Sequence, residues 1–414
     1  MSIEEARSKI EPWRVNYNQN RSHADQGRTS NLENKTMDIK KRQFLAAGMG
    51  LAVGAGLTNR AALAQEAAGQ RPSAYGEASK SGGQVKSFAG SGKQTSMVDM
   101  NYKPRRLNKA IELWEADQPV FYATYAPSGV ADGYEMGKAM AKTWCDAINY
   151  EMEQASFDIS NLRNFMQGLV DGGPTRSGHR LPMVFVSPPV TGLDATYMRA
   201  NSWVIDQILA AGVQSIDLCH SRDPEAVEVA VQAMRYPFDY PGVPKQRLEG
   251  LRGNGSESFA SHIWGITGNQ YLHRADVWPL NPKGELCLGL KIEDKYAHAN
   301  AMKTLGIPGV CFAEWGAGDS TVSILGLAGY PEDVPSRGDG TAATPGAEAR
   351  NDPRLEKARL AVLAACKAHG IRPLNMGNSR DPIENYKQGT RVMGGGDEAA
   401  ALACREFTKR TMPI

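Results

Sequence analysis

The chain has 414 residues, of which 41% are hydrophobic, so it is long enough for one large domain or two ordinary ones and can bury a full core. Lysine and arginine total 47 against 45 for aspartate and glutamate, and the net charge of +2 gives no electrostatic reason to expect a nucleic-acid partner. The six cysteines are scattered singly, without a C-x-x-C pair or a histidine at zinc-finger spacing, which indicates buried free thiols.

The first hundred residues differ from the rest of the chain. Residues 1–36 are polar and aperiodic, and a basic head at residues 40–42 then precedes a short apolar segment at 44–57 and the small residues Ala62-Leu63-Ala64. This order is that of a secretory signal peptide, and the apolar part is too short for a permanent membrane anchor.

The stretch KRQFL resembles a twin-arginine export signal with Lys41 in place of the first arginine. We therefore expect Met37 to be the true start and the protein to lie in the periplasm, without membrane association after export. A disordered, uncleaved arm on a cytoplasmic protein is the alternative. Residues 1–64 form the N-terminal extension and signal peptide in this interpretation, and residues 65–104, rich in Gly, Ser, Gln and Ala, form a flexible lead-in.

From Arg105 onward, short apolar runs alternate with amphipathic helical stretches such as 199–212, 223–235 and 352–370, which is the pattern of a parallel sheet. The last two stretches open with Asp-Pro, and the third closes on Gly370, both of which are helix-boundary signals. The predicted strands are 120–126, 147–153, 182–188, 215–220, 286–293, 309–316, 371–377 and 391–396. Eight strands predict a (β/α)8 TIM barrel over residues 105–414, whereas an open doubly wound sheet lacks the expected G-x-G-x-x-G.

The strand that ends in GLKIED carries charges where a barrel enzyme places its chemistry. Because side chains alternate along a strand, Lys291 and Glu293 point toward the barrel axis while Ile292 points toward the helices. The next strand brings Glu314 and Asp319 near the same rim. Carboxylates so placed repel one another unless a cation lies between them, which predicts a divalent metal, with magnesium or manganese favoured by oxygen ligands. A solvated rim with ordinary ion pairs is the alternative.

The segment LGLKIEDKYAHANAMKTLGIPGVCFAEWGAGD resembles the metal-site segment of the HpcH/HpaI aldolase/citrate lyase family. WCDAINYEMEQASFD, AMRYPFDYPG and GLRGNG are similar to further family motifs and follow in the family's order, so the resemblance runs from about Arg106 to the C-terminus. It implies a barrel of the phosphoenolpyruvate/pyruvate-domain type and a class II metal-dependent aldolase, which is a carbon–carbon lyase. Such an enzyme acts on a 2-ketoacid or 4-hydroxy-2-ketoacid through a pyruvate enolate.

The resemblance also implies the residues of the site. Glu293 and Asp319 would hold the metal, which would be Mg, Mn or Co, and their separation matches the family spacing. Gln154, Gly316 and Gly318 would contact the substrate. Family members commonly exchange their last helix between subunits, which implies a homo-oligomer, a hexamer in particular.

Three departures from the family pattern affect the acid/base groups. Gln154 stands where the family has a histidine and cannot take up a proton near neutral pH. Phe185 replaces an arginine that stabilises enolate charge, and Ala210 replaces an aspartate. We expect His220 as the general base and Lys291 as the ammonium beside the enolate oxygen to make up the loss. A hydrogen-bonded rim histidine, a lysine in an ordinary ion pair, and a metal-bound water as base are the alternatives.

These departures leave other functions open. A ketoacid-binding protein that kept the metal and lost catalysis is one alternative, and a metal-dependent hydrolase or hydratase on the same scaffold is another. The Gly- and Pro-rich stretch after Asp319 has little periodicity and is expected to cover the site as a lid or to contact another subunit. Only Arg337 and Arg350 could clamp a nucleotide tail there, which argues against a coenzyme A thioester.

Overall fold

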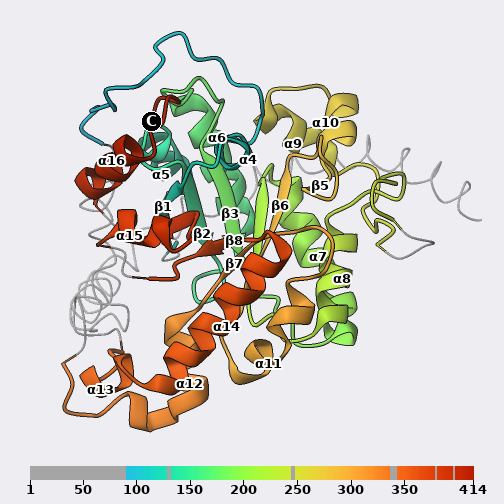
Figure 1. The fold of residues 1–414 in the computed structure, drawn as a ribbon. Coiled ribbons are helices and arrows are strands. Elements are labelled where there is room, and N and C mark those ends of the chain that lie inside the picture. Colours follow the sequence, from blue (N-terminus) through green and yellow to red (C-terminus); the bar gives the residue numbers. More distant parts are fainter. Residues whose placement is uncertain (1–89, 128–131, 244–247, 336–342, 378–379, 395–396) are drawn as a thin grey trace, which may run out of the picture. The chain divides into compact units, whose positions relative to one another are not determined.

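The computed structural model describes residues 90–127, 132–243, 248–335, 343–377, 380–394 and 397–414 (Figure 1). Residues 1–89 lie outside the described residues. The predicted start at Met37, the export signal and most of the predicted lead-in therefore stay predictions. No helix in the described ranges combines the length and apolarity needed to cross a membrane.

Within the described residues, eight parallel strands close into a barrel in the order β4-β3-β2-β1-β9-β8-β7-β6, and β6 pairs back with β4. The strands are β1 Val120–Tyr125, β2 Ala147–Glu151, β3 Met183–Ser187, β4 Ser215–Leu218, β6 Leu286–Lys291, β7 Val310–Glu314, β8 Arg372–Leu374 and β9 Val392–Gly394. Each lies inside the range predicted from the sequence, so the barrel is confirmed. A further two-residue strand, β5 (Val277–Trp278), pairs with the first two residues of β6.

Helices surround the barrel (Figure 1). They are α4 Lys109–Glu115, α5 Gly133–Met140, α6 Ile159–Gly172, α7 Ala195–Ala210, α8 Pro224–Ala233, α9 Glu257–Trp264, α10 Gly268–Arg274, α11 Lys295–Thr304, α12 Ala317–Leu325, α13 Ala347–Arg350, α14 Pro353–His369, α15 Pro382–Lys387 and α16 Glu398–Phe407, with a 3-10 helix η2 at Gly326–Gly329. Asp223 and Asp352 cap α8 and α14, and Gly370 ends α14 at φ 67°, as their sequence signals predicted.

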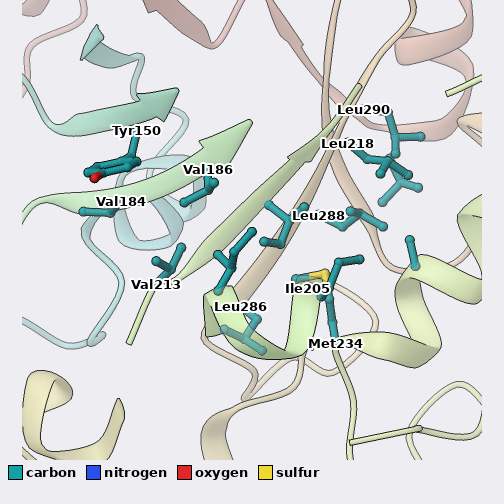
Figure 2. Close-up of a cluster of buried hydrophobic side chains, with 14 of the residues drawn as sticks. Tyr150, Val184, Val186, Ile205, Val213, Leu218, Met234, Leu286, Leu288 and Leu290 are labelled. Atoms are coloured by element: carbon teal, nitrogen blue, oxygen red, sulfur yellow. The ribbon is translucent and has the colours of Figure 1, made fainter. Parts of the chain in front are cut away.

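The alternation along β6 separates the core from the barrel axis. Leu286, Leu288 and Leu290 point outward into a buried apolar cluster that also contains Leu218 of β4, Ile205 of α7 and Met234, which follows α8 (Figure 2). Each of these buried side chains stabilises the fold by about 1.5–3 kcal/mol relative to exposure. The residues that alternate with these leucines therefore face the barrel axis. Lys291 and Glu293 belong to this inward-facing set, as the sequence predicted.

Aromatic rings fill the barrel interior. Phe185 of β3 packs edge-on against Tyr122 of β1, with ring centroids 5.1 Å apart, and against Phe312 of β7 at 5.9 Å. All six cysteines are free and buried, as predicted. An aromatic layer thus fills the middle of the barrel, and most of the polar side chains lie toward the ends of the strands.

Buried charges close the amino end of the barrel. Asp146, just before β2, lies 3.2 Å from Lys109 Nζ, 3.1 Å from Arg405 Nη2 and 2.7 Å from Arg410 Nη2, and all four side chains are at most 1% exposed. Arg405 belongs to α16 and Arg410 to the tail, so the C-terminal segment packs against the barrel of its own chain. Met412 is buried beside it.

Candidate active site

Three acidic or imidazole side chains meet at the carboxyl ends of the strands, which we call the mouth of the barrel. Glu153, His220 and Glu293 each lie two residues beyond the end of β2, β4 and β6, and their possible ligand atoms lie within 4.8 Å of one another. His220 Nε2 is 3.6 Å from Glu153 Oε1, and His220 Nδ1 is 3.8 Å from Glu293 Oε1. We call these three residues the mouth triad.

The backbone and ring of His220 are both held in place. Its φ of 43° lies in the left-handed region, which residues other than glycine seldom adopt. The backbone N–H donates to Glu293 Oε1 at 2.8 Å, and Nδ1 lies 3.1 Å from Asp294 Oδ2. The hydrogen bond with Asp294 raises the pKa of His220 although burial opposes it. Because Nδ1 is engaged, Nε2 is the ring atom left to face Glu153.

Asp294 is itself fixed by its neighbours. It caps α11 through the backbone N–H groups of Tyr296 and Ala297, and it accepts a hydrogen bond from Arg222 Nε at 2.7 Å. Burial alone would raise the pKa of Asp294, but the hydrogen bonds from His220 and Arg222 hold it well below its usual range. Asp294 is therefore a permanent anion that orients the imidazole.

Lys291, the last residue of β6, forms an ion pair with the mouth triad. Its Nζ lies 2.7 Å from Glu153 Oε2, and the side chain is only 10% exposed. Burial alone would lower the pKa of Lys291, but Cys219, Glu314 and Asp217 around it raise the pKa above its ordinary value. The lysine is therefore an ammonium at neutral pH, and Lys291 and Glu293 lie together at the mouth, where their shared strand parity predicted them.

Two further carboxyl groups lie inside the barrel. Asp217 on β4 is buried, and its Oδ1 has no hydrogen-bond partner among the described residues. Burial and then Glu314 raise the pKa of Asp217 well above its usual value. Burial also raises the pKa of Glu314, although Lys291 and a hydrogen bond from Asn375 Nδ2 at 3.2 Å oppose the shift. The mouth therefore holds more carboxyl groups than the single ammonium of Lys291 can balance.

The remaining predicted site residues lie around the mouth triad. Gly316 is the N-cap of α12 and packs directly on Glu293, since a Cβ at Gly316 would lie 2.5 Å from Glu293 Oε2. Asp319 is half-buried in the first turn of α12 and is not one of the three grouped residues. Gly318 and Gln154 are exposed. The structure thus brings Gly316 against Glu293, while the part of Asp319 as a ligand stays a prediction.

Sequence reasoning missed Glu153 and Asp217. Within EMEQ, the predicted contact was Gln154, whereas strand alternation puts Glu153 on the opposite face, two residues beyond the end of β2. The same alternation in SIDLCH puts Asp217 on the face of Ser215 and Cys219. Both signals were present in the sequence, because each residue alternates with outward-facing apolar residues of its own strand.

The departures from the family pattern have structural counterparts. Phe185 is 1% exposed and packs in the aromatic interior, where it brings no charge to the mouth. Ala210 ends α7 and is 5% exposed within the core. Strand β3 therefore lacks the positive charge that the family pattern has at the position of Phe185. Lys291 on β6, which contacts Glu153, supplies a positive charge at the mouth instead.

The donor set of the mouth triad suits a divalent cation. Two carboxylates and one imidazole are ligands for manganese or cobalt, and the imidazole makes magnesium less favoured than oxygen ligands alone would. Burial raises the pKa of Glu293 to about 7 even though Lys291 opposes the shift. A buried carboxyl that ionises only near neutrality gains stability from a cation beside it. The residues present therefore fit a metal ion.

The fold and the mouth define a (β/α)8 barrel with an acidic centre at the carboxyl ends of its strands. HpcH/HpaI aldolase/citrate lyase family proteins are among the solved structures that share this fold. The family protein from Burkholderia cenocepacia J2315 matches with a TM-score of 0.50 and 18% identity, covering 71% of this chain and 94% of that chain. The resemblance expected from the sequence is therefore confirmed at the level of the fold.

Other matches are more distant. The HpcH/HpaI aldolase from Desulfitobacterium hafniense DCB-2 has a TM-score of 0.46 at 14% identity over 71% of this chain and 92% of that chain. A citrate lyase beta subunit from M. tuberculosis, complexed with oxaloacetate and magnesium, has a TM-score of 0.37 at 13% identity over 71% of this chain and 98% of that chain. No family model and no curated protein matches the chain.

Proposed function

We propose that this protein is a metal-dependent carbon–carbon lyase that acts on a 2-ketoacid or 4-hydroxy-2-ketoacid and releases pyruvate. The observation that carries the proposal is the grouping of Glu153, His220 and Glu293 at the mouth, with the Lys291 ammonium 2.7 Å from Glu153. Chemistry at the carboxyl ends of the strands is the rule for this barrel, so the fold supports the position of the site, and the reaction is inferred from the residues there.

The metal would be held by Glu293 together with either the other two members of the mouth triad or Asp319. When bound, a divalent cation supplies the positive charge that stabilises an enolate oxygen and orients a chelating ketoacid. Gly316 allows the backbone to approach Glu293 closely, since any side chain there would collide with it. The backbone N–H groups at the start of α12 have no side-chain cap and are suited to a carboxylate.

Proton transfer falls to His220 if the metal leaves Nε2 free. Asp294 holds Nδ1, so Nε2 can take a proton from a hydroxyl and later return it. Lys291 donates to the developing enolate oxygen and supplies the charge that Phe185 does not. One such donor typically raises the reaction rate about 10²–10³-fold.

A protein that binds ketoacids without cleaving them is the second candidate, because Phe185 is buried among aromatic rings and Gln154 is exposed and cannot titrate. A hydrolase or hydratase on the same scaffold is a third. The test is to strip metal from the purified protein, add back manganese and supply a 4-hydroxy-2-ketoacid. Pyruvate release supports the lyase, a gain in thermal stability alone supports the binding protein, and other products indicate hydrolysis or hydration.

Export and assembly complete the proposal. We expect the protein to reach the periplasm through the signal at residues 37–64 and to form a homo-oligomer, a hexamer in particular. The basic head followed by a short apolar segment supports export. Reading the N-terminal residue of the natural protein tests the start and the compartment, since a mature end near Gln65 is expected, and light scattering tests the assembly.

A further inference from the structure

Three adjoining cavities lie at the end of the barrel opposite the mouth. The first has a volume of about 580 Å³ and is lined by Arg105, Arg106, His273, Arg274, Pro282 and Lys283. The second, about 230 Å³, shares Arg106 with the first, and the third, about 290 Å³, shares Gly178 and Arg180 with the second. We call these three cavities the basal groove.

The chain order places the basal groove at the amino ends of the strands. Residues 104–107 precede α4 and β1, residues 178–181 precede β3, and Gln214 precedes β4. His273 and Arg274 end α10, and Pro282 and Lys283 lie between β5 and β6. Figure 1 shows α4, α9 and α10 at one end of the barrel and α12, which carries the mouth residue Gly316, toward the other. The basal groove is therefore separate from the mouth triad.

The lining of the basal groove is cationic. No aspartate or glutamate is among the described residues that line its three cavities. Five permanently charged side chains line it, namely Arg105, Arg106, Arg180, Arg274 and Lys283. Such a surface concentrates anions at one place on a chain whose overall charge is close to balanced.

Buried carboxylates fix the arginines from behind. Glu285 has no exposed side-chain surface, and its Oε1 lies 3.7 Å from Arg106 Nη1 and 3.6 Å from Arg274 Nη1. Glu112 is equally buried and accepts from Arg105 Nε at 3.2 Å. Arg105 and Arg274 nevertheless keep 68% and 48% of their side chains exposed, so their guanidinium groups are positioned and still open to a ligand.

The charges do not cancel. Glu112, Glu115 and Glu285 are the carboxylates paired with the lining arginines. Five cations against these three carboxylates leave an excess of two positive charges, before any contribution from His273. Arg105, Arg180, Arg274 and Lys283 are exposed, so a ligand with more than one negative charge can pair with several of them at once.

A buried polar residue is part of the lining of the middle cavity. Gln214 lines that cavity with 1% of its surface exposed, and its Nε2 donates to the Leu107 carbonyl at 3.3 Å. Its Oε1 has no hydrogen-bond partner among the described residues. A buried acceptor without a donor costs about 1–3 kcal/mol, so this atom is suited to a water molecule, and the binding of an anion rests on the cations of the groove.

We propose that the basal groove binds a small phosphorylated anion of the diphosphate or triphosphate class. Guanidinium groups pair two-pronged with phosphate oxygens, and a run of several arginines matches a ligand with several phosphate groups better than it matches a single carboxylate. The first cavity lies within the usual size range of small-molecule sites, which is about 300–1,000 Å³. The ketoacid substrate at the mouth is a different ligand at the opposite end of the barrel.

The test is calorimetric titration of the purified full chain with inorganic diphosphate. The variant Arg274→Glu/Lys283→Glu reverses two cations of the first cavity and should weaken binding about tenfold or more, since each reversal replaces attraction by repulsion. The matched control Lys303→Glu/Lys357→Glu makes the same charge change on exposed residues of α11 and α14 and should bind within about twofold of the parent protein. Circular dichroism and the melting temperature check that both variants are folded.

Two results would overturn the proposal. One is an absence of diphosphate binding by the parent protein, and the other is equal loss of binding in the two double variants, which would mean that overall charge alone attracts the anion. Citrate is the comparison for ligand class, and citrate that binds as tightly as diphosphate would contradict the assignment to phosphate. Orthophosphate should bind more weakly than diphosphate because it reaches fewer of the cations.

Discussion

The ammonium of Lys291 lies 2.7 Å from Glu153 Oε2, and this ion pair connects the barrel interior to the mouth triad. Lys291 is the cation that the buried acids Asp217 and Glu314 share, and Glu153 is one of the three residues grouped as candidate ligands. The position of one side chain therefore affects both the charge balance inside the barrel and the geometry of the mouth.

Replacing Lys291 tests whether its ammonium takes part in catalysis. Lys291→Met should lower kcat by a hundred- to a thousandfold, on the order of 10²–10³, because a preorganised donor to the enolate oxygen is lost. Steady-state kinetics of pyruvate release with saturating manganese measures the effect. Lys295→Met, an exposed lysine at the start of α11, is the control and should retain the parent rate. An unchanged kcat in a folded Lys291→Met protein would remove Lys291 from the mechanism.

The two possible ligand sets for the metal make opposite predictions. Because Glu153 is grouped with Glu293 and Asp319 is not, Glu153→Gln should weaken manganese binding by at least about 10–100-fold and Asp319→Asn should weaken it less. Titration of manganese followed by electron paramagnetic resonance measures both affinities. Glu293→Gln should weaken binding in either case. A larger loss in Asp319→Asn than in Glu153→Gln would favour the ligand pair that the sequence motif implied.

The hydrogen bond between His220 and Asp294 predicts a pH effect. Asp294 raises the pKa of His220, so removal of the negative charge by Asp294→Asn should lower that pKa. If catalysis needs neutral His220, either as the base or as a metal ligand through Nε2, activity is lost as pH falls through this pKa, and the acidic limb of the profile of kcat/KM against pH should move to lower pH. Asp223→Asn makes the same change at the N-cap of α8, where asparagine still accepts the cap hydrogen bond, and it controls for the loss of a carboxylate at a helix start. A limb that does not move would show that His220 is not the titrating base.

The barrel and its inward-facing positions could be predicted from the sequence because strand alternation is a local property. Leu286, Leu288 and Leu290 read as one apolar face, and Lys291 and Glu293 therefore had to lie on the other. The grouping of Glu153 with His220 could not be predicted, because it depends on how far each loop extends past β2 and β4. The left-handed φ of His220 has no distinct sequence signal either.

The six buried cysteines and the helix caps at Asp223 and Asp352 were predictable for a related reason, since each depends on one residue and its neighbours. Helix α12 was not predicted, because the Gly-rich stretch around Asp319 carries little helical periodicity and its N-cap, Gly316, makes no side-chain cap bond. Asp319 lies in the first turn of α12, so its position depends on a helix that the sequence did not predict. For this reason the sequence alone could not show whether Asp319 reaches the other candidate metal ligands.

The charge cluster around Asp146 predicts a large stability effect. Asp146→Asn should reduce the free energy of unfolding by about 3–5 kcal/mol, because the cations of Lys109, Arg405 and Arg410 would remain buried without their carboxylate. Lys109→Met is the matched control and should cost much less, since two arginines still neutralise Asp146. Urea denaturation measures both changes, and equal losses in the two variants would contradict the assignment of Asp146 as the centre of the cluster.

The same cluster has a defined pH dependence. Burial alone would raise the pKa of Asp146, but Arg410, Arg405 and Lys109 hold it well below its usual range. The stabilisation is therefore present above the unfolded-state pKa, about 3.9, and is lost as pH falls below it toward the folded-state value. The parent protein should lose stability over this acidic range more steeply than Asp146→Asn, and parallel curves for the two proteins would contradict the assignment.

Exchange of the pyruvate methyl protons with deuterated water tests the central claim most directly, because it reports enolate formation and needs no knowledge of the aldehyde partner. Protein stripped of metal and reconstituted with manganese should catalyse loss of the methyl proton signal in nuclear magnetic resonance spectra. The metal-free protein and Glu293→Gln should not catalyse this loss. Absence of exchange in the manganese-loaded parent protein, or equal exchange with and without metal, would contradict a metal-dependent lyase centred on Glu293.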